Sequence, residues 1–195
     1  MDSVLVIASG NTGKLREIHA LLDPFRVNVL PQSDFNVPEA DELHPTFIEN
    51  ALVKARHACY HTGLPALADD SGICVRALNN APGVLSARYA GEPKSDQRNN
   101  QKLVESLSSA SDRSAYYYCV MVLLQHVEDP RPIIAEGLWH GEIIMSPRGE
   151  GGFGYDPYFF IPELKKTAAE LHSDVKNKIS HRGKALARLI ANLRQ

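Results

Sequence analysis

Short apolar runs that alternate with helical patterns constrain the fold of this chain most strongly. The first run, SVLVIA at residues 3–8, is rich in β-branched residues and is typical of a buried strand. Helical spacing follows over residues 14–22 and stops at Asp23-Pro24, and RVNVL at 26–30 then alternates as a strand does. Because strands are interleaved with helices, the sequence predicts an α/β protein with a mixed sheet.

Later segments continue this pattern. TFIENALVKARHACYHTG opens on Thr46 with Glu49 three residues later, as in a capping box, and closes at Gly63, so it predicts a helix in which Glu49 is structural. ALADD and GICVRAL predict two strands joined by a tight bend at Ser71, and the polar stretch 31–45 predicts an exposed loop. We also expect a helix at 95–107, strands at 114–127 and 132–144, and a closing amphipathic helix at 180–194 with Leu186, Leu189, Ile190 and Leu193 on one face.

Composition limits the classes of function. The 195 residues are 44% apolar and contain no repeat or dividing linker, so we expect a single domain over 1–195. The formal charge is -2 and no polybasic stretch is present, which disfavours nucleic-acid binding. The first apolar run is too short for a signal-peptide core or a membrane span, and the three scattered cysteines form no CxxC pair. We expect a soluble, cytoplasmic protein without a membrane partner.

A glycine-containing loop joins the first expected strand to the first expected helix. ASGNTGKLRE at 8–17 lacks the spacing of a Walker A loop, because only two residues separate Gly10 from Gly13, whereas four separate the glycines of a Walker A loop. Glycines nevertheless let backbone amides face outward, the following helix offers unpaired N–H groups, and Lys14 adds a charge. The loop therefore predicts a phosphate site, and an ordinary turn with a solvated lysine is the alternative.

Acidic residues gather in two places. Asp69 and Asp70 end an apolar segment, where carboxylates suit Mg2+, a hard cation that keeps several waters for substrate phosphates. Alternatively, one of them caps a turn. Because side chains alternate between the two sides of a strand, only one of these two carboxylates can point into a cleft. Glu39, Asp41 and Glu42 share an earlier loop. The two groups together predict a metal site.

Two later segments add groups that suit a nucleotide. GGFGYDP at 151–157 can bring a backbone and a ring close to a flat ligand, with Asp156 as an acceptor. Lys176, His181 and Arg182 stand within seven residues, and this cluster favours an anion site, although a lone histidine is more often structural. The whole constellation predicts a nucleoside triphosphate site.

The order of these motifs carries a family resemblance. The chain contains, in sequence, SGNTGKLREI, TFIENALVKA, ADDSG, APGVLSARYAG, GGFGYDPYFF, KTAAEL and SHRGKAL. With them it resembles the inosine triphosphate pyrophosphatases, the Ham1 or RdgB family of non-canonical purine nucleotide pyrophosphatases, and most of all the bacterial branch. The resemblance implies an elongated mixed β-sheet flanked by helices, two lobes around a central cleft, and a homodimer. It also implies Mg2+-dependent hydrolysis of ITP, dITP, XTP and dXTP to the monophosphate and pyrophosphate, which cleanses the nucleotide pool.

The resemblance implies roles for individual residues as well. Asp70 is the expected proton acceptor and a metal ligand, and Glu42 is the second metal ligand, with Asp41 as the alternative in the same loop. The expected substrate contacts are Ser9, Gly10, Asn11, Thr12, Gly13 and Lys14 for the triphosphate, Phe153, Gly154, Tyr155 and Asp156 for the nucleoside, and Ser71, Lys176, His181 and Arg182 for the base and phosphates.

Selectivity for 6-oxo purines has a physical explanation. A hydrogen-bond donor aimed at O6 meets another donor when adenine is offered, so adenine is rejected. His181, Arg182 and the backbone N–H groups of 153–156 are the candidate donors. Two other functions stay open: a Maf-like pyrophosphatase of pyrimidine or modified nucleotides, and a nucleotide-sensing or RNA-binding module without turnover.

Overall fold

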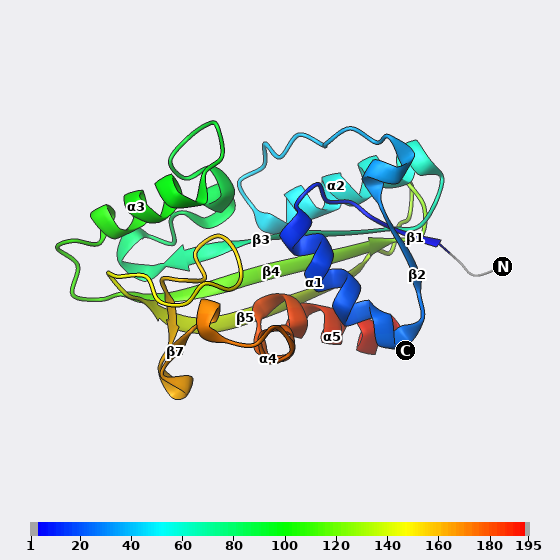
Figure 1. The fold of residues 1–195 in the computed structure, drawn as a ribbon. Helices are drawn as coiled ribbons and strands as arrows, with labels where there is room; N and C mark the ends of the chain where they lie inside the picture. Colours follow the sequence, from blue (N-terminus) through cyan, green and yellow to red (C-terminus); the bar gives the residue numbers. More distant parts are fainter. Residues whose placement is uncertain (1–3, 194–195) are drawn as a thin grey trace. The chain divides into compact units, whose positions relative to one another are not determined.

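The computed structural model describes residues 4–193 (Figure 1). Its strands are β1 (Val4–Ile7), β2 (Asn28–Pro31), β3 (Ala66–Val75), β4 (Ser114–Leu124), β5 (Ile133–Ile143), β6 (Phe159–Ile161) and β7 (Lys166–Thr167). Its α-helices are α1 (Thr12–Leu22), α2 (Phe47–Thr62), α3 (Asp96–Ser106), α4 (Ser173–Ile179) and α5 (His181–Leu193). Short 3-10 helices cover Asp23–Phe25, Gln32–Phe35, Arg76–Leu78, Gly83–Arg88, Pro162–Leu164 and Ala168–Glu170. Residue 3 of the first predicted strand and residue 194 of the last predicted helix lie outside the described residues.

The strands form a mixed sheet in the order β2-β1-β3-β4-β5-β6-β7. β1 pairs in parallel with β2, where Val4 lies opposite Asn28, and with β3, where Val6 lies opposite Ala66. β6 pairs antiparallel with both β5 and β7. The predicted α/β fold with a mixed sheet is therefore confirmed.

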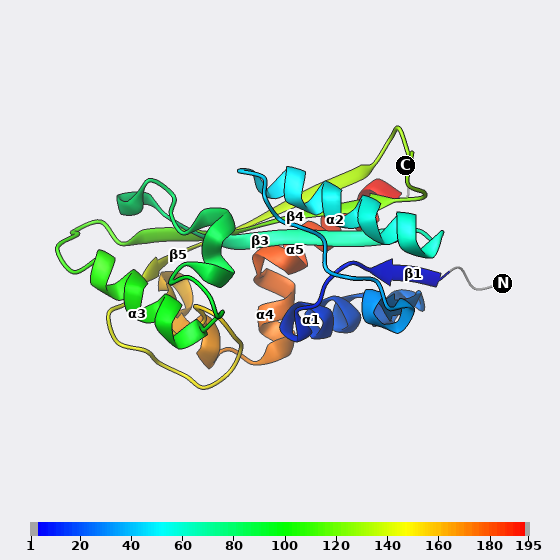
Figure 2. The same cartoon turned by 90° about the horizontal axis from the view of Figure 1, so that it is seen from above.

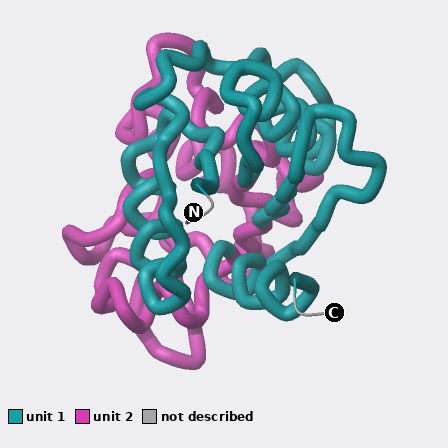
Figure 3. The backbone as a smooth tube through the Cα atoms, turned by 90° about the vertical axis from the view of Figure 1, so that its right-hand side faces the viewer, with its two compact units in different colours: residues 1–70, 119–137, 182–195 teal, residues 71–118, 138–181 magenta. Residues whose placement is uncertain are grey.

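The chain divides into two compact units (Figure 3). Unit 1 takes in residues 1–70, 119–137 and 182–195, as far as they are described, and unit 2 takes in 71–118 and 138–181. Each of β3, β4 and β5 begins in one unit and ends in the other. The central cleft and the single domain over 1–195 stay predictions.

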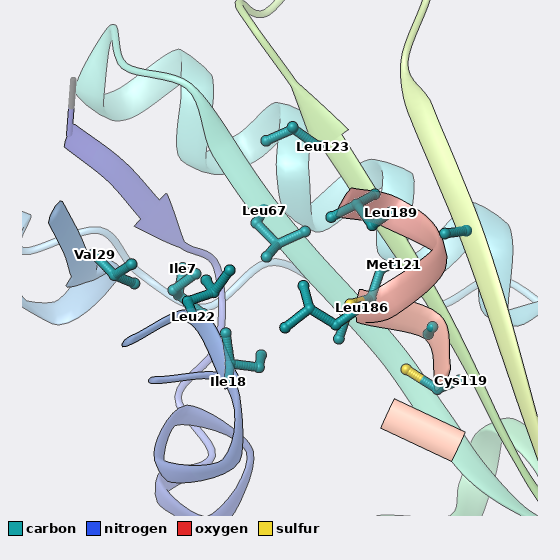
Figure 4. Packing of buried hydrophobic residues seen from close by; sticks show 12 residues of the cluster. Ile7, Ile18, Leu22, Val29, Leu67, Cys119, Met121, Leu123, Leu186 and Leu189 are labelled. Carbon is teal, nitrogen blue, oxygen red and sulfur yellow. The ribbon is translucent and has the colours of Figure 1, made fainter. Parts of the chain in front are cut away.

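Helices cover both faces of the strands of unit 1. Figures 1 and 2 show α2 on one side of these strands and α1 and α5 on the other. Figure 4 shows the apolar core on the side of α1 and α5. The labelled core residues are Ile7, Ile18, Leu22, Val29, Leu67, Cys119, Met121, Leu123, Leu186 and Leu189. The burial of these residues holds α1 and α5 against the sheet.

Helix α2, which was predicted from its caps, agrees with the structure better than α5, which was predicted from its periodicity. Thr46 caps α2 as predicted, because its hydroxyl oxygen accepts from the Glu49 N–H at 3.4 Å, and Gly63 ends the helix in a left-handed conformation. On α5, Leu186 and Leu189 are buried, but Leu193 is 48% exposed. The inclusion of Leu193 in the buried face is therefore wrong, because the core of unit 1 ends before the last turn of the helix.

Unit 2 has an aromatic core of its own. Tyr117 of β4, Trp139 of β5 and Phe159 of β6 pack together with Tyr155, and Trp139 is 4% exposed. Trp139 is therefore a core residue of unit 2. The three cysteines, Cys59, Cys74 and Cys119, are all buried and free.

The predicted bend at Ser71 is wrong, because β3 runs without interruption from Ala66 to Val75. Serine and glycine permit a turn but do not require one, and nearly every residue of β3 is buried, as in a central strand. Asp69 and Asp70 are consequently neighbours within a strand, and their side chains point to opposite faces. Neither aspartate caps a turn at this place.

Candidate active site

The structure distributes the predicted site residues over both units. Those of unit 1 are Ser9, Gly10, Asn11, Thr12, Gly13, Lys14, Glu42, Asp70 and Arg182, and those of unit 2 are Ser71, Phe153, Gly154, Tyr155, Asp156, Lys176 and His181.

The glycine-containing loop between β1 and α1 is closed by its own side chains. The Asn11 Oδ1 atom accepts from the N–H groups of Gly13 and Lys14 at 2.9 and 3.1 Å, and Ser9 Oγ accepts from the Asn11 N–H at 3.2 Å. The expectation that the first amides of α1 are unpaired is therefore wrong for Gly13 and Lys14, since Asn11 caps the helix through these two N–H groups. The Ser9 hydroxyl and the Asn11 amino group remain as donors that these bonds do not use.

Asp69 is the centre of a buried charge cluster on the α1 and α5 side of β3. Its Oδ2 atom lies 3.1 Å from Lys14 Nζ and 3.2 Å from Arg182 Nη2, and Arg182 also bonds Glu17. We call Asp69, Lys14, Arg182 and Glu17 the Asp69 cluster. Asp69 and Arg182 are each 1% exposed. The cluster fixes the lysine of the glycine-containing loop and the first turn of α5 to the same strand.

Charge balance sets the ionisation of the Asp69 cluster. Burial opposes ionisation of Asp69, but the charges of Lys14, Arg182 and Lys54 outweigh it and hold the pKa of Asp69 well below its usual range. Burial likewise opposes the charge on Arg182, and the carboxylates of Asp69 and Glu17 reverse that effect and raise its pKa. Burial together with Asp69 raises the pKa of the Cys119 thiol to about 12, so this thiol is not a nucleophile.

Asp70 points to the other face of β3, toward α2. Its Oδ1 atom lies 3.3 Å from Lys54 Nζ, and its Oδ2 atom accepts from Asn50 Nδ2 at 3.3 Å. Lys54 Nζ also lies 2.6 Å from Glu42 Oε1, so one ammonium group joins the carboxylates of Glu42 and Asp70. The two carboxylates that were expected to share a metal ion thus share the ammonium group of Lys54 in this structure.

The pKa shifts at Asp70 and Lys54 follow from the same arrangement. Burial raises the pKa of Asp70, and the positive charges of Lys54 and Lys14 offset this only in part. For Lys54, burial lowers the pKa, but the negative charges of Asp70, Asp69 and Glu42 outweigh it and the pKa is raised. Asp70 is therefore more basic than an ordinary aspartate, and Lys54 stays charged.

The donor set around Lys54 fits Mg2+ bound together with a substrate. Mg2+ in nucleotide sites is held by one or two carboxylates plus phosphate oxygens and waters, and Glu42 and Asp70 supply such a pair. Within residues 4–193 no group of three or more His, Cys, Asp and Glu side chains can hold a metal by itself. Asp41 is exposed. The geometry accordingly favours Glu42 over Asp41 as the second ligand.

In unit 2, Asp156 organises the loop predicted to bind the nucleoside. Its Oδ2 atom accepts from the Phe153 N–H at 2.9 Å and lies 2.7 Å from Lys176 Nζ. The same ammonium group lies 4.9 Å from the centroid of the Phe153 ring. A side chain at Gly152 would collide with the Asp156 carboxylate, and Gly152 has a φ of +76°, so only glycine suits that position.

Helix α3 fixes Gly154 in the same loop. The Gly154 N–H donates to Asp96 Oδ2 at 2.8 Å, and the Gly154 carbonyl accepts from Asn100 Nδ2 at 2.8 Å. Tyr155 faces inward, where its ring lies in the core of unit 2 and its hydroxyl donates to the Ser86 carbonyl at 2.8 Å. Phe153 is therefore the ring of this loop that is not part of the core.

His181 lies against aromatic rings of unit 2. Its ring stacks on Tyr117 at 4.6 Å between centroids with an interplanar angle of 9°, and the Trp139 ring lies 6.5 Å away. The Tyr117 hydroxyl donates to Asp156 Oδ1 at 3.4 Å. Tyr117 thus connects His181 with Asp156, two residues that were both predicted to bind substrate.

Sequence reasoning missed Lys54 and Asn50. Both lie on the buried face of α2, whose other buried residues are the small Ala51, Ala55, Ala58 and Cys59. Asn50 and Lys54 are four residues apart and so share one helix face. Two polar side chains at this spacing among small apolar residues are the signal that could have identified them.

Known proteins match this chain over nearly its whole length. The sequence profile described as the Ham1 family matches residues 5–192. A protein of Nitrosomonas europaea named dITP/XTP pyrophosphatase is 67% identical over 189 residues, which cover 97% of this chain and 93% of that protein. The solved structure of a HAM1 protein from Coxiella burnetii has a TM-score of 0.91 at 50% identity and covers 98% of both chains. The Ham1 protein of Staphylococcus aureus has a TM-score of 0.87 at 39% identity, again covering 98% of both chains.

In the described part of this chain, no helix has the length and apolarity to cross a membrane.

Proposed function

Because this chain belongs to the Ham1 family, we propose that it hydrolyses non-canonical purine nucleoside triphosphates, namely dITP, ITP, XTP and dXTP, to the monophosphate and pyrophosphate. The observation in the structure that supports this most is the joining of Glu42 and Asp70 by the single ammonium group of Lys54. Two carboxylates beside a lysine, in a unit that also carries Lys14, suit a metal-bound triphosphate.

We assign the triphosphate to the residues of unit 1. The Ser9 hydroxyl and the Asn11 amino group are donors for phosphate oxygens, and Lys14 and Lys54 bring positive charge. Glu42 and Asp70 would hold Mg2+, which when bound neutralises charge on the phosphates and makes pyrophosphate a better leaving group. Positioning and charge neutralisation are the main contributions a protein makes to phosphoryl transfer.

We assign the proton transfer to Asp70. Water attacks the α-phosphorus, the bond from that phosphorus to the bridging oxygen breaks, and pyrophosphate leaves. The proton of the water passes to the Asp70 carboxylate. Burial raises the pKa of Asp70, and a base whose pKa lies closer to the working pH accepts a proton more readily.

We assign the nucleoside to the residues of unit 2. The Phe153 ring offers a face for the purine, and Lys176 and His181 lie in the same unit as the Asp156 loop. Among the loop amides, those of Phe153, Gly154 and Asp156 are engaged within unit 2. The Tyr155 N–H is the loop amide for which the described residues provide no acceptor, and it is therefore our candidate donor to O6.

Three further parts of the account are proposals of the same kind. Mg2+ is the metal, because two carboxylates and phosphate oxygens match its preference for few protein ligands. The enzyme is a homodimer, which light scattering on the purified protein tests. It acts in the cytoplasm, where cell fractionation should recover it.

A substrate panel tests the proposed function. Purified protein with Mg2+ is given dITP, XTP, dGTP, dATP and dTTP in turn, and monophosphate, pyrophosphate and orthophosphate are resolved by chromatography. We expect dITP and XTP to give monophosphate and pyrophosphate, with little product from the others. Preferential cleavage of dTTP would support the Maf-like alternative, and nucleotide binding without any product would support a non-catalytic binding module.

A further inference from the structure

Asn50 is, like Lys54, a polar residue on the largely apolar buried face of α2. It is 1% exposed, and the other buried residues of this helix are Ala51, Ala55, Ala58 and Cys59. Asparagine is a poorer helix former than alanine, and a buried amide without partners is costly. The hydrogen bonds of the Asn50 side chain must therefore explain its presence.

The Asn50 amide joins two segments of unit 1 at once. Its Oδ1 atom accepts from the His44 N–H at 3.1 Å, and its Nδ2 atom donates to the His44 carbonyl at 3.1 Å. Nδ2 also donates to Asp70 Oδ2 at 3.3 Å. The orientation of the amide follows from these partners, because a flipped amide would set oxygen against the His44 carbonyl and the Asp70 carboxylate.

These bonds fasten the acidic loop close to Glu42. His44 is two residues beyond Glu42, and Asn50 holds both of its backbone polar groups. On the other side of Glu42, the Pro38 carbonyl lies 2.9 Å from His57 Nε2 of the same helix. Helix α2 thus holds the loop on both sides of Glu42, and Asn50 is the contact that also reaches Asp70.

We propose that Asn50 is a positioning residue that holds the Glu42 segment in register with Asp70, so that both carboxylates are arranged for Mg2+ before a nucleotide binds. The inference rests on the proposed function of the site. Groups that hydrogen-bond metal ligands set their orientation and so the affinity of the site. Asn50 does this for Asp70 directly and for Glu42 through the backbone of His44.

The test compares Asn50→Ala with a matched control, Asn99→Ala. Asn99 is also buried and helical, and its side chain also joins backbone groups, accepting from the Ala90 N–H and donating to the Ala87 carbonyl. Two quantities are measured for each protein: amide hydrogen exchange at His44 without metal, and the Mg2+ concentration that gives half-saturation in a calorimetric titration and in dITP turnover.

We expect Asn50→Ala to speed exchange at the His44 amide and to raise the half-saturating Mg2+ concentration by about 10- to 100-fold. Asn99→Ala should lower the melting temperature and leave both quantities at their wild-type values. If Asn50→Ala does not fold, Asn50→Leu, which keeps the branched shape of the side chain and removes the hydrogen bonds, serves in its place.

Two results would overturn the role of Asn50. One is unchanged exchange at His44 together with unchanged Mg2+ dependence, and the other is an equal shift in the Asn99 control. A wild-type protein without Mg2+-dependent turnover would instead disprove the proposed function. In that event, His44 exchange and metal titration without nucleotide would still decide whether Asn50 holds the loop.

Discussion

Replacement of Asp69 by asparagine removes the carboxylate at the centre of the Asp69 cluster. In the wild type this carboxylate lies 3.1 Å from Lys14 and 3.2 Å from Arg182, and Asp69 and Arg182 are almost fully buried. The substitution keeps the size of the side chain and takes away its negative charge. Arg182 then depends on Glu17 as its remaining partner in the cluster, and Lys14 loses the salt bridge to β3.

The expected loss of stability follows from the burial of these charges. Removal of one partner from a buried ion pair costs about 3–5 kcal/mol, because the other charge is left uncompensated. Glu17 still neutralises part of the charge on Arg182, so we expect the lower end, about 3 kcal/mol. For a chain of this length each kcal/mol lowers the melting temperature by about 2–4 °C, which gives a decrease of about 6–12 °C.

Thermal unfolding followed by circular dichroism at neutral pH measures this change. Asp174→Asn is the matched control, because the Asp174 side chain is 78% exposed and its replacement should change stability by less than about 0.5 kcal/mol. A melting temperature for Asp69→Asn within about 2 °C of the wild type would refute the reasoning. It would mean that the buried cations do not depend on Asp69.

The acid dependence of this effect has a defined sign. Burial opposes ionisation, but neighbouring cations hold the pKa of Asp69 below its ordinary value of 3.8. A carboxylate with a depressed folded-state pKa stabilises the protein above the unfolded-state value, and this stabilisation is lost as the pH falls toward the folded-state pKa. The difference between wild type and Asp69→Asn should therefore narrow below about pH 4.

Three further predictions concern activity. Asp70→Asn should lower kcat by about 100- to 10,000-fold with little change in melting temperature, and near-full turnover would remove Asp70 as the base. Lys176→Met, which removes the ion pair with Asp156, should lower kcat/KM for dITP by about 10- to 100-fold, and an unchanged value would exclude Lys176 from nucleoside binding. Chelation by EDTA should stop turnover and added Mg2+ should restore it, whereas turnover that persists in EDTA would contradict a role of Glu42 and Asp70 as metal ligands.

Local signals in the sequence predicted much of the fold. Thr46 and Gly63 mark the ends of α2, and Asp23-Pro24 marks the end of α1, because caps and prolines act on their own neighbours. The short elements β6, β7 and α4 were not predicted, since two to seven residues carry too little periodicity. The bend at Ser71 was predicted wrongly because burial of a strand depends on neighbours that are distant in sequence.

The residue types of the candidate site could be predicted from the sequence, but which side chains contact one another could be predicted less well. Alternation along β3 allowed only one of Asp69 and Asp70 to face a given side, and the structure shows Asp69 in an ion cluster and Asp70 beside Lys54. Lys54 and Asn50 were missed, because a capping box had already explained the start of α2. Tyr155 was expected at the nucleoside, but its ring packs in the core of unit 2. The spacing of GGFGYDP does not indicate which of its two aromatic side chains faces inward.

Hydrolysis of dITP in water enriched in oxygen-18 tests the central claim most directly, because it identifies the phosphorus that water attacks. The protein is incubated with dITP and Mg2+, and the products are separated and analysed by mass spectrometry. Attack at the α-phosphorus, with Asp70 as the base, predicts that the heavy oxygen appears in dIMP and that pyrophosphate is unlabelled. Label in pyrophosphate or in released orthophosphate would place the attack at another phosphorus and contradict the account.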